Sequence, residues 1–166
     1  MKTIFSTLMI ASFLMACGAP KSNEEAKAPE VSEEPVTQEA VVEEPNALVN
    51  DYIALKDALV ATNAADAQTA AQTLATNEAA TESIKSLAQT ISETEDVELQ
   101  REKFFELTTA FIEYAKANDL GTKLYVQYCP MAFNNTGANW VSVSSEIRNP
   151  YFGDRMLKCG RVDEEI

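Results

Sequence analysis

Four sulfur-bearing side chains near the C-terminal end of the sequence stand in two short pairs. Cys129 and Met131 are separated by one proline, and Met156 and Cys159 by two residues. Pro130 favours an extended backbone at Cys129, and side chains at i and i+2 of an extended chain point to one side. On a helical turn, positions i and i+3 share a face. Each pair therefore aims two sulfur atoms in one direction.

Thiolates and thioethers are soft ligands, and a site of two cysteines and two methionines without imidazole selects Cu(I) or Ag(I) over zinc and hard cations. All four sulfur residues are therefore candidate ligands of one monovalent metal ion. Basic side chains nearby would favour the thiolates. These are Arg148, Arg155, Lys158 and Arg161.

Two other roles fit the same residues. Cys129 and Cys159 can form a disulfide in an oxidising compartment, which would close a 31-residue loop and contribute roughly 3–4 kcal/mol. The two methionines can serve as core fillers, and the thiols can be unreactive. Spacing alone leaves the metal site, the disulfide and inert thiols open.

The composition excludes several classes of function. The chain has no histidine, which excludes most acid–base catalysis, haem attachment at CxxCH and the common zinc sites. No nucleophile and base stand in a recognisable pair, so we expect no enzyme. The net charge of −13 excludes a nucleic-acid partner, which requires a basic surface.

Residues 1–16 have the features of a lipoprotein signal peptide. The apolar run that follows Lys2 is too short to span a bilayer, which takes roughly 20 residues. Leu14-Met15-Ala16-Cys17 resembles a lipobox, so we expect cleavage before Cys17 and its lipidation. Gly18 instead of aspartate then favours the periplasmic side of the outer membrane.

A tether is predicted at residues 17–45, because this stretch is rich in proline and glutamate and contains no aromatic residue. A helical domain with the C-terminal Cys/Met motif is expected at 46–162, and an acidic tail at 163–166.

Apolar residues recur at helical spacing through residues 46–120, a stretch without proline or glycine. The pattern predicts four helices, the first starting at Asn46. For the fourth, residues 92–95 offer a capping box and Gly121 a stop signal. Its stripe of apolar residues is expected in the core. These residues are Phe104, Leu107, Phe111 and Ala115.

The C-terminal quarter has a different character. Residues 123–128 and 140–143 have strand composition, residues 149–153 have turn composition, and 154–159 fit a short helix ending at Gly160. The predicted fold class is mainly α, an antiparallel bundle of about four helices followed by a small strand–loop–short-helix motif.

Three segments carry a resemblance to a known family: YVQYCPMAF at 125–133, GANW at 137–140 and IRNPYFGDRMLKCG at 147–160. They resemble the uncharacterised domain appended to some CusB-like periplasmic adaptors of copper and silver efflux pumps, a domain also found alone in small lipoproteins. The resemblance spans about residues 46–162, with the helical part similar only in pattern. The chain contains neither the hairpin nor the barrel domain of those adaptors.

The resemblance implies an association with copper handling, and it shifts the balance toward Cu(I) or Ag(I) at Cys129, Met131, Met156 and Cys159. The sequence thus favours a lipid-anchored copper chaperone or buffer. Its expected partner is an efflux-pump adaptor or another copper-handling envelope protein. The alternative is a non-metal interaction module of the envelope with a structural Cys129–Cys159 disulfide.

The lipobox makes a direct prediction. Substitution of Cys17→Ser should abolish labelling with a radioactive fatty acid and leave an uncleaved or mislocalised product, because serine cannot receive the diacylglycerol. Electrophoretic mobility and membrane fractionation measure this. Unchanged membrane association of the variant would disprove the anchor.

Overall fold

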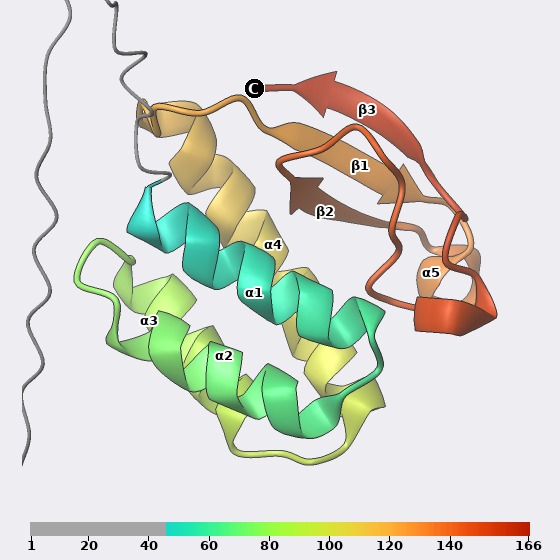
Figure 1. Cartoon of the computed structure of the whole chain (residues 1–166), viewed down its shortest axis with the longest axis horizontal. Coiled ribbons are helices and arrows are strands. Elements are labelled where there is room, and N and C mark those ends of the chain that lie inside the picture. Colours follow the sequence, from blue (N-terminus) through green and yellow to red (C-terminus); the bar gives the residue numbers. More distant parts are fainter. Residues whose placement is uncertain (1–45) are drawn as a thin grey trace, which may run out of the picture. The chain divides into compact units, whose positions relative to one another are not determined.

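Four helices form the first part of the structure. A computed structural model describes residues 46–166. The predicted signal peptide, Cys17 and the tether lie outside the described residues. The helices are α1 (Ala47–Val60), α2 (Ala64–Thr76), α3 (Glu82–Ser92) and α4 (Val97–Ala117), and each packs against the next (Figure 1). The predicted helical bundle is confirmed.

Polar side chains cap the starts of these helices. Asn46 accepts a hydrogen bond from the first turn of α1, as predicted. The start of α4 is instead capped by Asp96, whose carboxylate accepts two backbone N–H groups at 2.9 and 3.4 Å. The capping box predicted at 92–95 is therefore wrong, because the Asp96 carboxylate satisfies the free N–H groups and is favoured by the helix dipole. At its other end, α4 stops at Ala117, before the predicted stop at Gly121.

Tyr52 of α1 lies in the centre of the core. Its ring stacks on Phe104 and Phe111 of α4, with centroids 5.3 and 4.1 Å apart. Its hydroxyl hydrogen-bonds to the Thr108 hydroxyl at 2.8 Å and accepts the Val141 N–H at 3.1 Å. The predicted apolar stripe of the fourth helix is thus confirmed as core.

A three-stranded antiparallel sheet follows the bundle. It consists of β1 (Tyr125–Cys129), β2 (Ala138–Ser142) and β3 (Arg161–Glu165), in the order β2-β1-β3. The short segment α5 (Ala132–Asn135) joins β1 to β2, and a 3-10 turn, η1 (Gly153–Arg155), precedes β3. Of the strands, β2 packs against α1 and α4, so the sheet rests on the bundle through β2 (Figure 1).

The third strand was not predicted, and it includes most of the expected acidic tail at 163–166. Every side chain of β3 is exposed, so its sequence lacks the apolar alternation that identifies a strand. Backbone pairing with β1 and the ion pairs Lys116–Glu164 and Lys123–Glu165 hold it in place.

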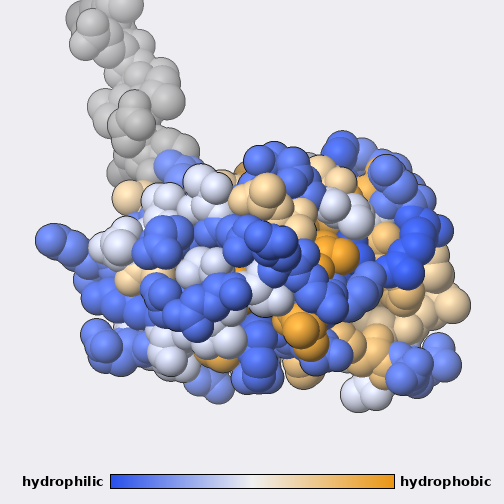
Figure 2. Space-filling view, turned by 90° about the horizontal axis from the view of Figure 1, so that it is seen from below, coloured by the Kyte–Doolittle hydropathy of each residue, from blue (hydrophilic) through white to orange (hydrophobic). Residues whose placement is uncertain are grey.

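The surface seen in Figure 2 is mostly hydrophilic, with hydrophobic residues in small separate patches. Within residues 46–166, no helix combines the length and apolarity needed to cross a bilayer.

The packing of Tyr52 predicts the effect of truncating its closest aromatic neighbour. Phe111 is fully buried, so Phe111→Ala should lower the free energy of unfolding by about 3–5 kcal/mol through lost contacts and a residual cavity. Urea denaturation measures this. Phe105 of the same helix is 36% exposed, and Phe105→Ala is the matched control with a much smaller loss. Equal losses in both variants would contradict this account of the core.

Candidate metal centre at the cysteine pair

The strands β1 and β3 bring the two cysteines together. Cys129 ends β1, and Cys159 lies two residues before β3, its antiparallel neighbour. The two Sγ atoms are 3.0 Å apart, and both residues are free thiols. Cys129 is fully buried, whereas Cys159 is half-buried. The proximity that a shared metal ion or a disulfide requires is therefore present.

Asn149 positions the segment that carries Cys159. Its side-chain amide donates to the Cys159 carbonyl at 2.9 Å, and its backbone N–H donates to the Leu157 carbonyl at 2.9 Å. Its side-chain oxygen accepts the Tyr151 N–H at 2.8 Å. The sequence indicated only a turn here. An asparagine directly before a proline is the signal that could have suggested this role, because asparagine bonds to nearby backbone in turns.

The two methionines lie next to the cysteine pair in the backbone network. The Met131 N–H donates to the Cys159 sulfur, and the Cys159 N–H donates to the Met156 carbonyl at 3.0 Å. Both methionines line a cavity of about 460 Å³, which neither cysteine lines. The structure therefore places the two cysteines in contact with each other, and both methionines on the wall of a neighbouring cavity. Convergence of all four sulfurs on one point stays a prediction.

The short helix predicted at 154–159 is reduced to the single 3-10 turn η1. The backbone leaves helical geometry at Met156, with φ of −151°. The hydrogen bond from Cys159 N–H to the Met156 carbonyl closes one further turn. Met156 and Cys159 are thus related by a turn and not by a helical face. The hydrogen bonds of Asn149 to this segment explain the difference, because they hold the backbone away from a continuing helix.

A run of left-handed residues follows Met131. Phe133, Asn134 and Asn135 have φ values of 49°, 56° and 68°. Asparagine tolerates left-handed backbone dihedral angles, but phenylalanine adopts them only at a cost in conformational free energy. The ring of Phe133 packs against Phe105 and Tyr151, with centroids 5.3 Å from each. These contacts offset the strain and fix the turn that returns the chain from β1 to β2.

Trp140 is a buried neighbour of the pair. Cys129 lies opposite Ala138 across β1 and β2, and Trp140, two residues on, projects from the same face. A Cβ atom added at Gly160 would lie 2.7 Å from the indole, so the chain after Cys159 passes directly against the ring. Trp140 is completely buried and is part of the core.

The charges around the two cysteines differ from the expectation that nearby basic side chains stabilise thiolates. Three of the four basic side chains are engaged elsewhere, since Arg155 pairs with Glu98, Lys158 with Glu146 and Arg161 with Asp163. The hydrogen bond with Cys129, assisted by burial, raises the pKa of Cys159 to about 11. The Cys159 thiol therefore holds its proton at neutral pH, and a metal ion must displace that proton to bind.

The pair has few other metal-binding side chains around it. Within residues 46–166, no group of three or more His, Cys, Asp or Glu side chains is arranged to hold a metal ion. Further donors to an ion at the cysteines would thus be thioethers or backbone carbonyls.

The raised pKa of Cys159 predicts how its reactivity depends on pH. Only the thiolate is nucleophilic, so alkylation of Cys159 by iodoacetamide in the reduced protein should still accelerate above pH 9, the ordinary pKa of the thiol. The substitution Cys129→Ala removes the hydrogen-bond partner, which is the largest cause of the shift, and should move the titration to lower pH. Rates measured by mass spectrometry from pH 7 to 10 test this. A plateau near pH 9 in the parent would contradict the shift.

Comparison with known proteins bears on the helical part of the chain. Among curated proteins and solved structures, no match to the chain is found. A family model described as "Protein of unknown function (DUF3347)" matches residues 48–123, which contain the four helices except for Ala47 and end before β1. A DUF3347 domain is therefore found at residues 48–123, and the cysteine pair lies in the segment that follows it.

Proposed function

We propose that this protein binds Cu(I) or Ag(I) through Cys129 and Cys159, with Met131 and Met156 as further donors, and acts as a copper chaperone or buffer. The observation that carries the proposal is the pair of free thiols 3.0 Å apart at the junction of β1 and β3. Thiolates and thioethers are the donors that soft monovalent ions prefer.

Binding requires a small movement of one cysteine. With metal–sulfur bonds of about 2.3 Å, as in zinc thiolates, two sulfurs in a trigonal arrangement stand about 4 Å apart. The thiols are 3.0 Å apart, so the pair has to open by roughly 1 Å. Cys129 is buried at the end of a strand, whereas Cys159 is half-buried in a loop. We therefore expect Cys159 to be the residue that moves.

The exposure of the sulfur residues suits transfer by ligand exchange. Met131 is 46% exposed and offers a thioether to an arriving ion, while Cys129 is fully buried and can hold it away from water. A partner that approaches the Met131 side can add its own donor before the thiolates release the ion. No bond to carbon is made or broken, so this role needs no catalytic residue.

The setting of this role rests on the sequence. The resemblance to a domain appended to copper and silver efflux adaptors supports a link to heavy-metal efflux. The lipobox at Cys17 supports an anchor on the periplasmic side of the outer membrane. An efflux adaptor or another copper-handling envelope protein is the proposed partner.

The complete burial of Cys129 favours a second candidate, a structural disulfide in a non-metal interaction module of the envelope. Both thiols already lie in contact, so oxidation needs little rearrangement. Under this candidate, reduction should lower the free energy of unfolding by roughly 3–4 kcal/mol, and the methionines should have no influence on ligand binding.

Titration of the reduced protein with Cu(I) tests the proposal. The full chain with Cys17→Ser retains only the two candidate cysteines. We expect one Cu(I) per chain, with a change in the fluorescence of Trp140, the single tryptophan. Substitution of Met131→Leu together with Met156→Leu preserves volume and apolarity. It should weaken Cu(I) binding about tenfold or more, equal to roughly 1.4 kcal/mol.

Two controls make the titration decisive. Cys159→Ser should abolish the fluorescence response, and Zn(II) should compete poorly, because the donors are soft. Unchanged affinity in the double methionine variant would remove the thioethers from the site. No Cu(I) binding by the reduced parent would disprove the proposed function and leave the disulfide candidate.

A further inference from the structure

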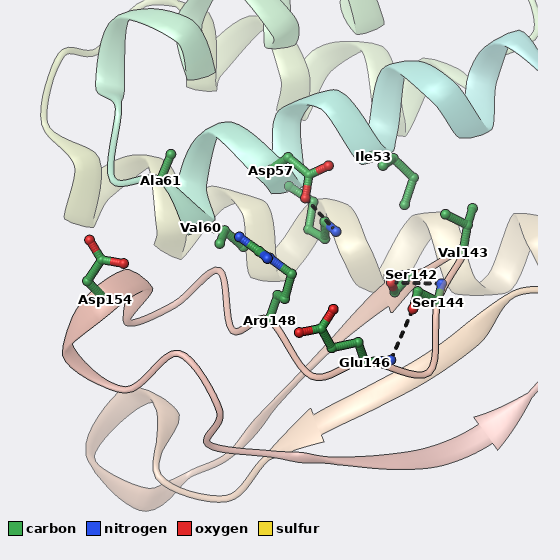
Figure 3. Close-up of a pocket in the computed structure, with 11 residues that line it drawn as sticks. Ile53, Asp57, Val60, Ala61, Ser142, Val143, Ser144, Glu146, Arg148 and Asp154 are labelled. Carbon is green, nitrogen blue, oxygen red and sulfur yellow. Dashed lines mark hydrogen bonds and ion pairs between the residues drawn. The ribbon is translucent and has the colours of Figure 1, made fainter.

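A second cavity lies on another part of the domain, between α1 and the loop that follows β2. Its volume is about 620 Å³, within the range of pockets that bind small ligands. From α1 it is lined by Ile53, Lys56, Asp57 and Val60, and from the C-terminal segment by residues that include Ser142, Ser144 and Arg148 (Figure 3). None of the four sulfur residues lines it.

Lys56 brings a buried positive charge to this cavity. The residue is only 4% exposed, and its ammonium contacts the Asp57 carboxylate at 2.7 Å. An ammonium has three N–H donors, and no other described residue accepts one of them. Lys56 lines the cavity, so its remaining N–H groups are free to donate to an acceptor bound there.

Two serine hydroxyls are placed as further donors. Ser142 Oγ accepts the Ser144 N–H at 3.1 Å, and Ser144 Oγ accepts the Glu146 N–H at 3.1 Å. A hydroxyl that accepts in this way retains its own O–H to donate. Among residues 46–166, neither hydroxyl has an acceptor. The backbone thus fixes both oxygens at the edge of the cavity, with their hydrogens available.

Arg148 supplies the fourth donor group. Its side chain extends from the loop toward α1 across the cavity (Figure 3). It forms no hydrogen bond or ion pair with another residue of the described part of the chain. Its planar guanidinium presents paired N–H groups that match a carboxylate.

The acidic side chains of the cavity limit the charge of a ligand. Asp57 and Glu146 are neutralised by Lys56 and Lys158, but Asp154 also lines the cavity. The lining itself holds these three carboxylates and two cations, Lys56 and Arg148, and this balance disfavours an ion with two or more negative charges. A singly charged anion matches the donors better, and the apolar side chains of the lining favour one with a small hydrocarbon group.

We propose that this cavity binds a free carboxylate attached to a small apolar group, through Lys56, Ser142, Ser144 and Arg148. The carboxylate could belong to a small organic acid or to the C-terminus of a peptide, and the two sources share this chemistry. The site is separate from the cysteine pair and does not depend on metal binding.

Calorimetric titration of the full chain in a non-ionic detergent tests the proposal. The probes are isovalerate, trialanine, trialanine amide and inorganic phosphate. We expect saturable binding of isovalerate or trialanine, and no binding of trialanine amide or phosphate. Tighter binding of trialanine would identify a peptide C-terminus as the source, and tighter binding of isovalerate a small acid.

Substitution of Arg148→Gln should weaken binding of the carboxylate probe about tenfold, because it removes a charge-assisted pair of hydrogen bonds. Arg148 is exposed, so the variant should fold. Arg161→Gln, an exposed position on β3 outside the cavity, is the matched control and should bind like the parent. Equal binding of trialanine and its amide, stronger binding of phosphate, no saturable carboxylate binding, or an unaffected Arg148→Gln variant would each overturn the proposal.

Discussion

The buried guanidinium of Arg101 joins three segments that are distant in sequence. Its Nε donates to the Pro150 carbonyl at 2.8 Å, and its Nη2 donates to the Leu59 carbonyl at 3.1 Å and to Thr62 Oγ1 at 3.0 Å. Nη1 pairs with Glu98 at 2.8 Å. Burial lowers the pKa of Arg101, and Glu98 opposes this effect. Because a buried charge is tolerated only when its donors are matched, the end of α1, the start of α4 and the turn before η1 must stay together.

This constraint explains why the segment with the second cysteine has a defined place. A Cβ atom at Gly153 would lie 2.3 Å from Thr62 Oγ1 and 3.1 Å from the Arg101 guanidinium, and its φ of +56° also favours glycine. The turn can therefore approach α1 only with glycine there. The side-chain amide of Asn149 donates to the Cys159 carbonyl and so fixes the segment that carries this cysteine. The next residues form β3, which pairs with β1. The distance between the two thiols is thus set by the bundle as well as by the sheet.

Both proposed sites lie in the part of the structure that follows the DUF3347 domain or where that part meets it. The cysteine pair uses only residues beyond 123, whereas the carboxylate cavity combines Lys56 of α1 with Arg148 of the later loop. The helices act as a scaffold in each case. Tyr52 shows how the scaffold reaches the sheet, since its hydroxyl joins Thr108 of α4 to the backbone of Val141 in β2.

The sequence by itself determined the helical bundle, the cap of α1 at Asn46, the core role of Phe111 and the strand composition around β1 and β2, because apolar periodicity and capping residues are local signals. It also singled out Cys129 and Cys159 as candidate ligands, because of their residue type and their spacing from Met131 and Met156. Only the tertiary structure decided that the two thiols touch, that Asn149 holds the loop, and that residues 163–166 join a sheet. Those features depend on hydrogen bonds and burial between segments far apart in the chain. The raised pKa of Cys159 has the same origin, since its hydrogen-bond partner Cys129 lies 30 residues away in the sequence.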